Sequence, residues 1–127
     1  MNIHSVKSTY SFDETRERIA DTLKENNFKV FESINHAAGA QNVGLSLPPS
    51  TLFIFGNPKG GTPLMNVDPR MGIVLPLKMH VYQAGDDVYI SYTDIQAAAQ
   101  SFGLAPDFGP LPKVSAKLDE MATKIAG

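Results

Sequence analysis

The sequence contains no cysteine and no tryptophan among its 127 residues. Without cysteine the protein cannot form disulfides, thiolate metal sites or thiol nucleophiles. The sequence also has no large surplus of positive or negative charge. Its 11 Lys and Arg and 13 Asp and Glu give a formal net charge of -2. This balance argues against nucleic acid as a partner, because a phosphate backbone is bound by surplus cations.

Long apolar runs are absent as well. The longest purely apolar stretch is residues 52–55, far short of the ~20 residues that a membrane-spanning helix needs. The opening residues, MNIHSVKSTY, show neither the cationic start nor the apolar run of a secretory signal. We therefore expect a cytoplasmic protein with no membrane partner. Its length predicts one domain, residues 1–127, with a core that needs no metal or disulfide.

The first part of the chain predicts a strand and then a helix. Residues 3–10 mix β-branched and polar side chains, which is typical of a strand. Ser11, followed three positions later by Glu14, forms the capping box that opens a helix. Apolar residues then recur at helical spacing, and we expect this helix to end at Asn26 and Asn27.

Two strands are predicted next, with a short helix between them at residues 36–44. The first strand covers residues 28–36, and its even-numbered side chains are predicted to share the face that rests on the preceding helix. These residues are Phe28, Val30, Glu32, Ile34 and His36. Residues 51–55 form an unbroken run of β-branched, aliphatic and aromatic side chains, which predicts a central strand that is covered on both faces.

The second half of the chain predicts a β-hairpin over residues 77–93 with a tight turn at Gly85. Pairing Ala84 with Asp87 sets a register in which one face of the hairpin is apolar and the other is polar. The polar face, here called the hairpin strip, carries Lys78, His80, Tyr82, Tyr89 and Ser91. Helices are predicted after it at residues 94–103 and 114–125. Together these elements indicate an α+β fold of order β-α-β4-α, with helices on one face of a mostly antiparallel sheet.

Three segments resemble the bacterial and archaeal family known as domain of unknown function 302. They are LFIFGNP at residues 52–58, GTPLM at 61–65 and GIVLPLK at 72–78, the last followed by a Tyr-containing hairpin. HAAGA at residues 36–40 and GLSLPPS at 44–50 are similar to that family too. The resemblance implies a fold like one half of the TATA-box-binding protein, assembled as a homodimer. It supplies no reaction and does not imply DNA binding, since a fold does not carry a function.

Residues 56–62 form a glycine and proline segment that could present backbone N–H groups to an anion. The phosphate loop of nucleotide triphosphatases needs a lysine where this chain has Thr62, so tight triphosphate binding is not predicted. Lys59 could serve a carboxylate or a monophosphate instead. We expect Thr62 to cap a brief helix that starts at Pro63. The alternative is a tight turn that needs these residues only for its shape.

His36 is predicted to end a strand on its apolar side, where burial would lower its proton affinity and suit it to act as a general base or an axial ligand. The alternative is a hydrogen-bonded structural histidine. Because no second ligand stands at metal spacing, we predict no metal and no cofactor. Lys78 in the hairpin strip could bind a carboxylate or act in acid-base chemistry. Such a strip is more often a solvated face or a dimer surface rich in tyrosine.

These observations favour a homodimeric small-molecule-binding module for a small anionic or carboxylated molecule, and they specify neither the ligand nor any reaction. The predicted pocket lies between the sheet, the glycine loop and residues 75–78, with the loop folded over the tyrosine-bearing hairpin. Its predicted ligand-binding residues are Asn57, Lys59, Thr62, Lys78 and His36, with walls from Phe53, Phe55 and Met65. One alternative is a small lyase, isomerase or hydrolase with His36 or Lys78 as the base. Another is a protein-assembly module that docks through the hairpin strip.

Overall fold

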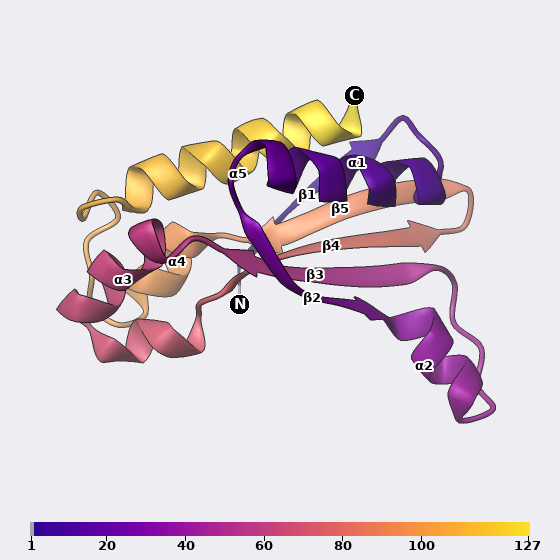
Figure 1. Cartoon of the computed structure of the whole chain (residues 1–127), viewed down its shortest axis with the longest axis horizontal. Coiled ribbons are helices and arrows are strands. Elements are labelled where there is room, and N and C mark those ends of the chain that lie inside the picture. Colours follow the sequence, from indigo (N-terminus) through magenta and orange to yellow (C-terminus); the bar gives the residue numbers. More distant parts are fainter. Residues whose placement is uncertain (1) are drawn as a thin grey trace.

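The computed structural model describes residues 2–127. It contains a five-stranded antiparallel sheet with the strand order β1-β5-β4-β3-β2 (Figure 1). The strands are β1 (Ile3–Ser8), β2 (Lys29–Asn35), β3 (Ser50–Gly56), β4 (Leu77–Ala84) and β5 (Asp87–Thr93). The helices are α1 (Phe12–Glu25), α2 (His36–Asn42), α3 (Pro58–Val67), α4 (Ile95–Gln100) and α5 (Leu111–Ala126), with a 3-10 helix, η1, at Pro69–Ile73. The predicted α+β class and the order β-α-β4-α are confirmed, with α2, α3, η1 and α4 as inserts.

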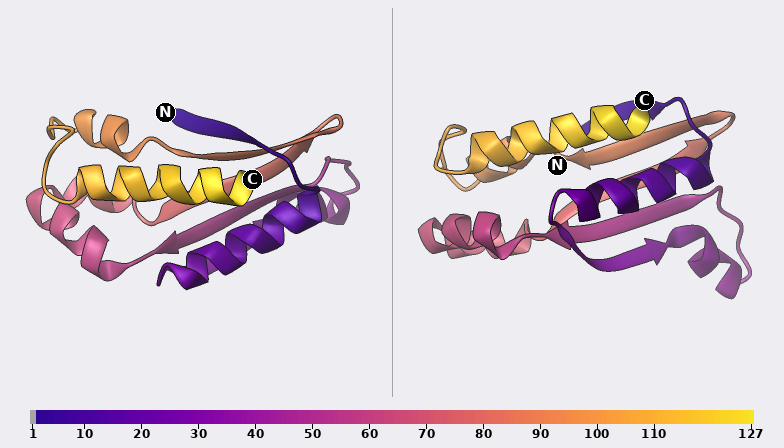
Figure 2. Two further views of the ribbon diagram at one scale, coloured as in Figure 1. Left: turned by 90° about the horizontal axis from the view of Figure 1, so that it is seen from above. Right: turned by 45° about the horizontal axis from the view of Figure 1, so that its top comes forward.

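The two long helices cover the same face of the sheet. Figures 1 and 2 show α1 and α5 over one face, while α2 and α3 lie at opposite ends of the sheet. Ile19 of α1 and Ile125 of α5 are fully buried between the helices and the sheet. Arg18 also donates hydrogen bonds from Nε to the carbonyl of Ile125 at 2.9 Å and from a terminal nitrogen to that of Lys124 at 2.9 Å. We call the uncovered side of the sheet the open face.

The local signals for the first helix hold. Ser11 caps α1, and its Oγ accepts a hydrogen bond from the Glu14 amide at 3.2 Å. The helix ends at its C-cap, Asn26, and Asn27 takes a φ of 62°, a left-handed conformation that asparagine tolerates better than most residues.

The hairpin register is also as predicted. Ala84 pairs with Asp87, Tyr82 with Tyr89 and His80 with Ser91, and Gly85 takes a φ of 62° in the turn. Because side chains alternate along a strand, this register sends one set to the core and the other to the open face. The buried set includes Met79, Val81, Val88, Ile90 and Tyr92.

The prediction that the even residues of β2 share one face is wrong, because a bulge interrupts the strand. Val30 pairs with Phe55 and Glu32 with Ile54, so Phe31 is an extra residue between two consecutive pairs. The alternation therefore reverses. Val30 lies on the helix-covered side, whereas Glu32 and Ile34 lie on the open face, and β2 is an exposed edge strand.

The prediction that residues 51–55 are covered on both faces is wrong as well. Phe53 and Phe55 are buried under the helices, but Leu52 and Ile54 are only partly buried on the open face. β3 is an interior strand between β2 and β4, and the middle position belongs to β4. The unbroken apolar run predicted burial on both faces of the strand. The long helices cover only one of these faces, so the side chains on the other face remain partly exposed.

Within residues 2–127, none of the helices has both the length and the apolar character that crossing a bilayer requires.

Candidate functional site

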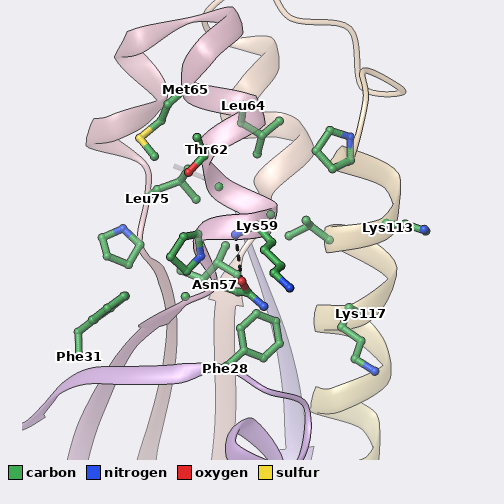
Figure 3. Close-up of a pocket in the computed structure, with 18 residues that line it drawn as sticks. Phe28, Phe31, Asn57, Lys59, Thr62, Leu64, Met65, Leu75, Lys113 and Lys117 are labelled. Atoms are coloured by element: carbon green, nitrogen blue, oxygen red, sulfur yellow. Dashed lines mark hydrogen bonds between the residues drawn. The ribbon is translucent and has the colours of Figure 1, made fainter.

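A hollow of about 820 Å³ opens at the end of the sheet where β3 runs into α3 (Figure 3). Its walls come from the start and bulge of β2, from α3, from residues 75–77 and from the first turns of α5. We call it the α3 groove. Its volume lies within the ~300–1,000 Å³ that is usual for small-molecule sites.

The floor of the groove is set by the start of α3. Asn57 follows β3 directly, and its Oδ1 accepts a hydrogen bond from the Lys59 amide at 3.0 Å (Figure 3). Pro58 takes the first helical position, where its missing N–H costs nothing. The segment expected to be a glycine loop is therefore helical from residue 58, and the prediction that Thr62 caps a helix at Pro63 is wrong. The asparagine cap and the proline outweigh the poor helix propensity of Gly60 and Gly61.

Two glycines let the walls come close together. A Cβ at Gly61 would lie 3.4 Å from Leu75 Cδ1, and a Cβ at Gly56 would lie 3.2 Å from Phe31 Cε2. The contact at Gly56 would be tighter than ordinary van der Waals contact, and the contact at Gly61 would lie at its lower limit. The absence of a side chain at these two positions thus leaves space between the walls of the groove.

The lining is apolar with a cationic border. The apolar side chains that line it include Phe28, Phe31, Leu64, Met65, Leu75 and Val114. The charged side chains that line it are Lys59, Lys113 and Lys117, with no Asp or Glu among the described lining residues. Lys117 lies 3.8 Å from Glu120, whereas neither Lys59 nor Lys113 makes an ion pair within residues 2–127.

The structure brings together some of the predicted ligand-binding residues and separates others. Asn57, Lys59, Thr62 and Met65 all line the α3 groove. Lys78 does not, because Leu77 points to the groove side of β4 and the next residue along a strand points to the opposite face. Lys78 instead borders a second hollow of about 510 Å³ with residues such as Ile73 and Thr93.

The structure also differs from the prediction in two of the wall residues and in the position of the hollow. Phe53 and Phe55 belong to the buried core, and Phe55 meets Phe28 edge to face with ring centroids 5.3 Å apart. Phe28 lines the groove, whereas Phe53 and Phe55 do not. The glycine segment lies at one end of the sheet beside α5 and does not cover the hairpin strip.

His36 is exposed at the first turn of α2, so the expectation that it is buried is wrong. Figure 1 shows α2 at the end of the sheet opposite α3. On the open face His36 begins a row of rings. Its centroid lies 6.0 Å from His80, His80 stacks on Tyr82 at 5.1 Å, and Tyr82 stacks on Tyr89 at 5.6 Å.

His80 is the titratable centre of this row. Its Nε2 shares a hydrogen bond with the Ser50 hydroxyl at 2.7 Å. Partial burial, and secondarily the neighbouring His36, lower the pKa of His80 below its usual 6.5. No group of three or more His, Cys, Asp or Glu side chains suited to a metal ion occurs in residues 2–127.

The lowered pKa of His80 predicts a loss of stability in mild acid. The folded state binds a proton at His80 less readily than the unfolded state does. Neutral His80 therefore contributes fully to the free energy of unfolding above the pKa that it has in the unfolded state. This contribution is lost as the pH falls through that value toward the lower pKa of the folded state. We expect the free energy of unfolding, measured in urea, to fall less between about pH 7 and pH 5 in His80→Gln than in the wild type. His4→Gln is the control. An identical fall in His80→Gln would contradict the assignment.

Residues 4–125 match the protein family described as Domain of unknown function DUF302. The chain belongs to the DUF302 family. This confirms the resemblance found in the sequence motifs. A crystal structure of an uncharacterized conserved protein DUF302 from Bacillus stearothermophilus has the same fold, with a TM-score of 0.80 at 22% identity. The match covers 99% of this chain and 96% of that one, and at this identity it bears on the fold alone.

This DUF302 chain also matches part of some longer curated proteins. Proteins named Fluoride-specific ion channel FluC 1 from Brucella suis biovar 1 and Brucella abortus biovar 1 are each 40% identical to it over 106 residues. The matched segment is 81% of this chain but 42% and 39% of those proteins. The chain thus spans about two fifths of the length of the curated relatives it matches.

The groove residues of this DUF302 chain that sequence reasoning missed include Phe28, Phe31, Lys113 and Lys117. Lys113 and Lys117 are four residues apart, which places both on one side of α5. That spacing indicated a cationic side of the helix. It carried no information that the side borders α3, because the two helices are distant in sequence.

Proposed function

We propose that this DUF302 domain is a homodimeric small-molecule-binding module and that the α3 groove is its ligand site. The observation that carries the proposal is the groove itself, about 820 Å³ with mainly apolar walls. Its borders are a strand end, two helices and a bulged edge strand, and such elements hold a site more firmly than loops do. We expect the module to act in the cytoplasm, in keeping with a sequence that has no cysteine.

The lining favours binding over catalysis. The described side chains there that titrate are three lysines, Lys59, Lys113 and Lys117. The two bases considered for an enzyme, His36 and Lys78, do not line the groove. Fluoride transport is not part of the proposal, because the match covers about two fifths of the proteins that carry that name.

The open face supports assembly with a second copy. Leu52 and Ile54 present apolar surface there beside the stacked rings of Tyr82 and Tyr89. His36 places the start of α2 on this side, and the segment that follows α2 exposes further apolar residues. They are Val43, Leu45 and Leu47, which are 72%, 65% and 46% exposed. Apolar and tyrosine-rich surface of this kind is typical of an interface between two like subunits.

The test of groove binding is an NMR titration of the full chain, labelled with ¹⁵N, against 2-naphthol, 2-naphthoate and 2-naphthylmethylamine. We expect at least one of them to shift amide signals of groove residues such as Gly56, Gly61 and Leu64 in a saturable way. Signals of α2, at the other end of the sheet, serve as the internal control. Shifts spread evenly over the surface, or none at all, would remove the proposal.

A further inference from the structure

We infer that the ligand of the α3 groove is an amphipathic anion, with a hydrophobic body and a single carboxylate or comparable negative group at one end. The inference rests on the proposed function and names the chemical class of its ligand. It depends on how apolar and cationic side chains divide the groove between them.

One end of the groove is apolar and open to solvent. Figure 3 shows Phe31, Leu75 and Met65 together on the side that is remote from α5. Phe31 is 47% exposed and Met65 is 37% exposed. Large hydrophobic side chains left accessible beside a hollow indicate a ligand body that covers them.

The other side of the groove is cationic. Lys59 extends from the first turn of α3 toward Phe28, and Lys113 and Lys117 stand on the border formed by α5 (Figure 3). The chain as a whole has more acidic than basic residues, but the described lining of the groove has three lysines and no acidic residue. The local charge of the groove is therefore opposite in sign to the net charge of the chain. Lys59 and Lys113 have no carboxylate partner within residues 2–127, so an incoming anion displaces no existing ion pair of theirs.

The two ends select a ligand by different forces. Burial of an alkyl or aryl body contributes in proportion to the apolar area removed from water, whatever the charge of the head group. The lysines add a smaller term that depends on the sign of that charge and is weakened by salt. A cationic head group would meet repulsion and a neutral one would gain nothing. The head group therefore decides which ligand is preferred, and the hydrophobic body supplies most of the binding free energy.

The experiment measures the binding of decanoate, 1-decanol and decylamine to the full chain by calorimetry. The three ligands share a chain of ten carbon atoms and are used at concentrations below those at which they form micelles. We expect decanoate to bind best, and about tenfold more tightly than decylamine. The substitution Lys59→Ala should raise the Kd of decanoate about fivefold and that of 1-decanol by less than about twofold, since the alcohol loses only contact with the aliphatic stem of the lysine. Added salt should weaken decanoate binding only. Lys78→Ala is the matched control, since Lys78 is also an exposed lysine but lies outside the groove.

Each other result overturns the inference in a recognisable way. Equal affinities for the three decyl compounds would remove the preference for an anion and leave groove binding intact. A loss of 1-decanol binding in Lys59→Ala equal to that of decanoate would show that the lysine acts only through structure. Failure of all decyl compounds while a naphthyl probe still shifts the groove amides would overturn the ligand class alone. Failure of both sets would remove the proposed function as well.

Discussion

Replacing Gly56 by leucine is expected to abolish ligand binding in the α3 groove while the protein stays folded. A Cβ at this position would lie 3.2 Å from Phe31 Cε2 and 3.8 Å from Pro76 Cβ, both of which belong to groove-lining residues. The rest of a leucine side chain would continue into the space between them. We expect the Kd of a bound decyl or naphthyl compound to rise by about 100-fold or more, equivalent to roughly 2.7 kcal/mol.

The fold should tolerate the change. Gly56 is not in the left-handed region that would exclude a side chain, and Phe31, on an exposed edge strand, can move by a few tenths of an ångström. Gly56→Ala should keep the groove open and change the Kd by less than about threefold. Gly39→Leu, where a Cβ meets nothing within 4 Å, controls for the added leucine. Gly61→Leu narrows the groove independently, from α3 toward Leu75. Unchanged binding in both Gly56→Leu and Gly61→Leu would exclude the groove as the site.

Local signals predicted the fold well because each acts over a few residues. Ser11 with Glu14 determined the start of α1, and Ala84 with Asp87 determined the hairpin register, both through contacts between near neighbours in the chain. The errors arose where tertiary structure decided the outcome. The bulge at Phe31 depends on pairing with β3, and a period-two pattern cannot show an extra residue.

The site was predictable only in part for the same reason. Asn57, Lys59 and Thr62 are close in sequence, so their shared position in the groove followed from one segment. Lys78 was assigned to the same place because it follows residues 75–77, but strand alternation turns it to the opposite face. Lys113 and Phe28 come from distant parts of the chain. Only the packing of α5 and β2 around α3 brings them into the groove.

A single acidic substitution on the open face, Leu52→Asp, is expected to convert the proposed dimer to a monomer. Leu52 lies on an interior strand between His80 and Ile34, near the middle of the face that no helix covers. Burying an unpaired carboxylate against a second subunit costs several kcal/mol, so we expect the dimer dissociation constant to rise by about a thousandfold or more. Light scattering after gel filtration should change from twice the chain mass of 13.8 kDa to that mass.

The same substitution costs far less in a free subunit, because residue 52 is only partly buried there and its carboxylate stays in contact with water. Far-ultraviolet circular dichroism should therefore be unchanged. Leu45→Asp, at a residue that is 65% exposed, tests the same interface from the segment after α2 without disturbing the sheet. Val67→Asp, at a residue that is 49% exposed and lies in α3 at the end of the sheet opposite α2, is the matched control and should leave the mass at the dimer value. A wild-type chain that elutes as a monomer, or dimers that persist in both Leu52→Asp and Leu45→Asp, would exclude the open face as the contact between subunits.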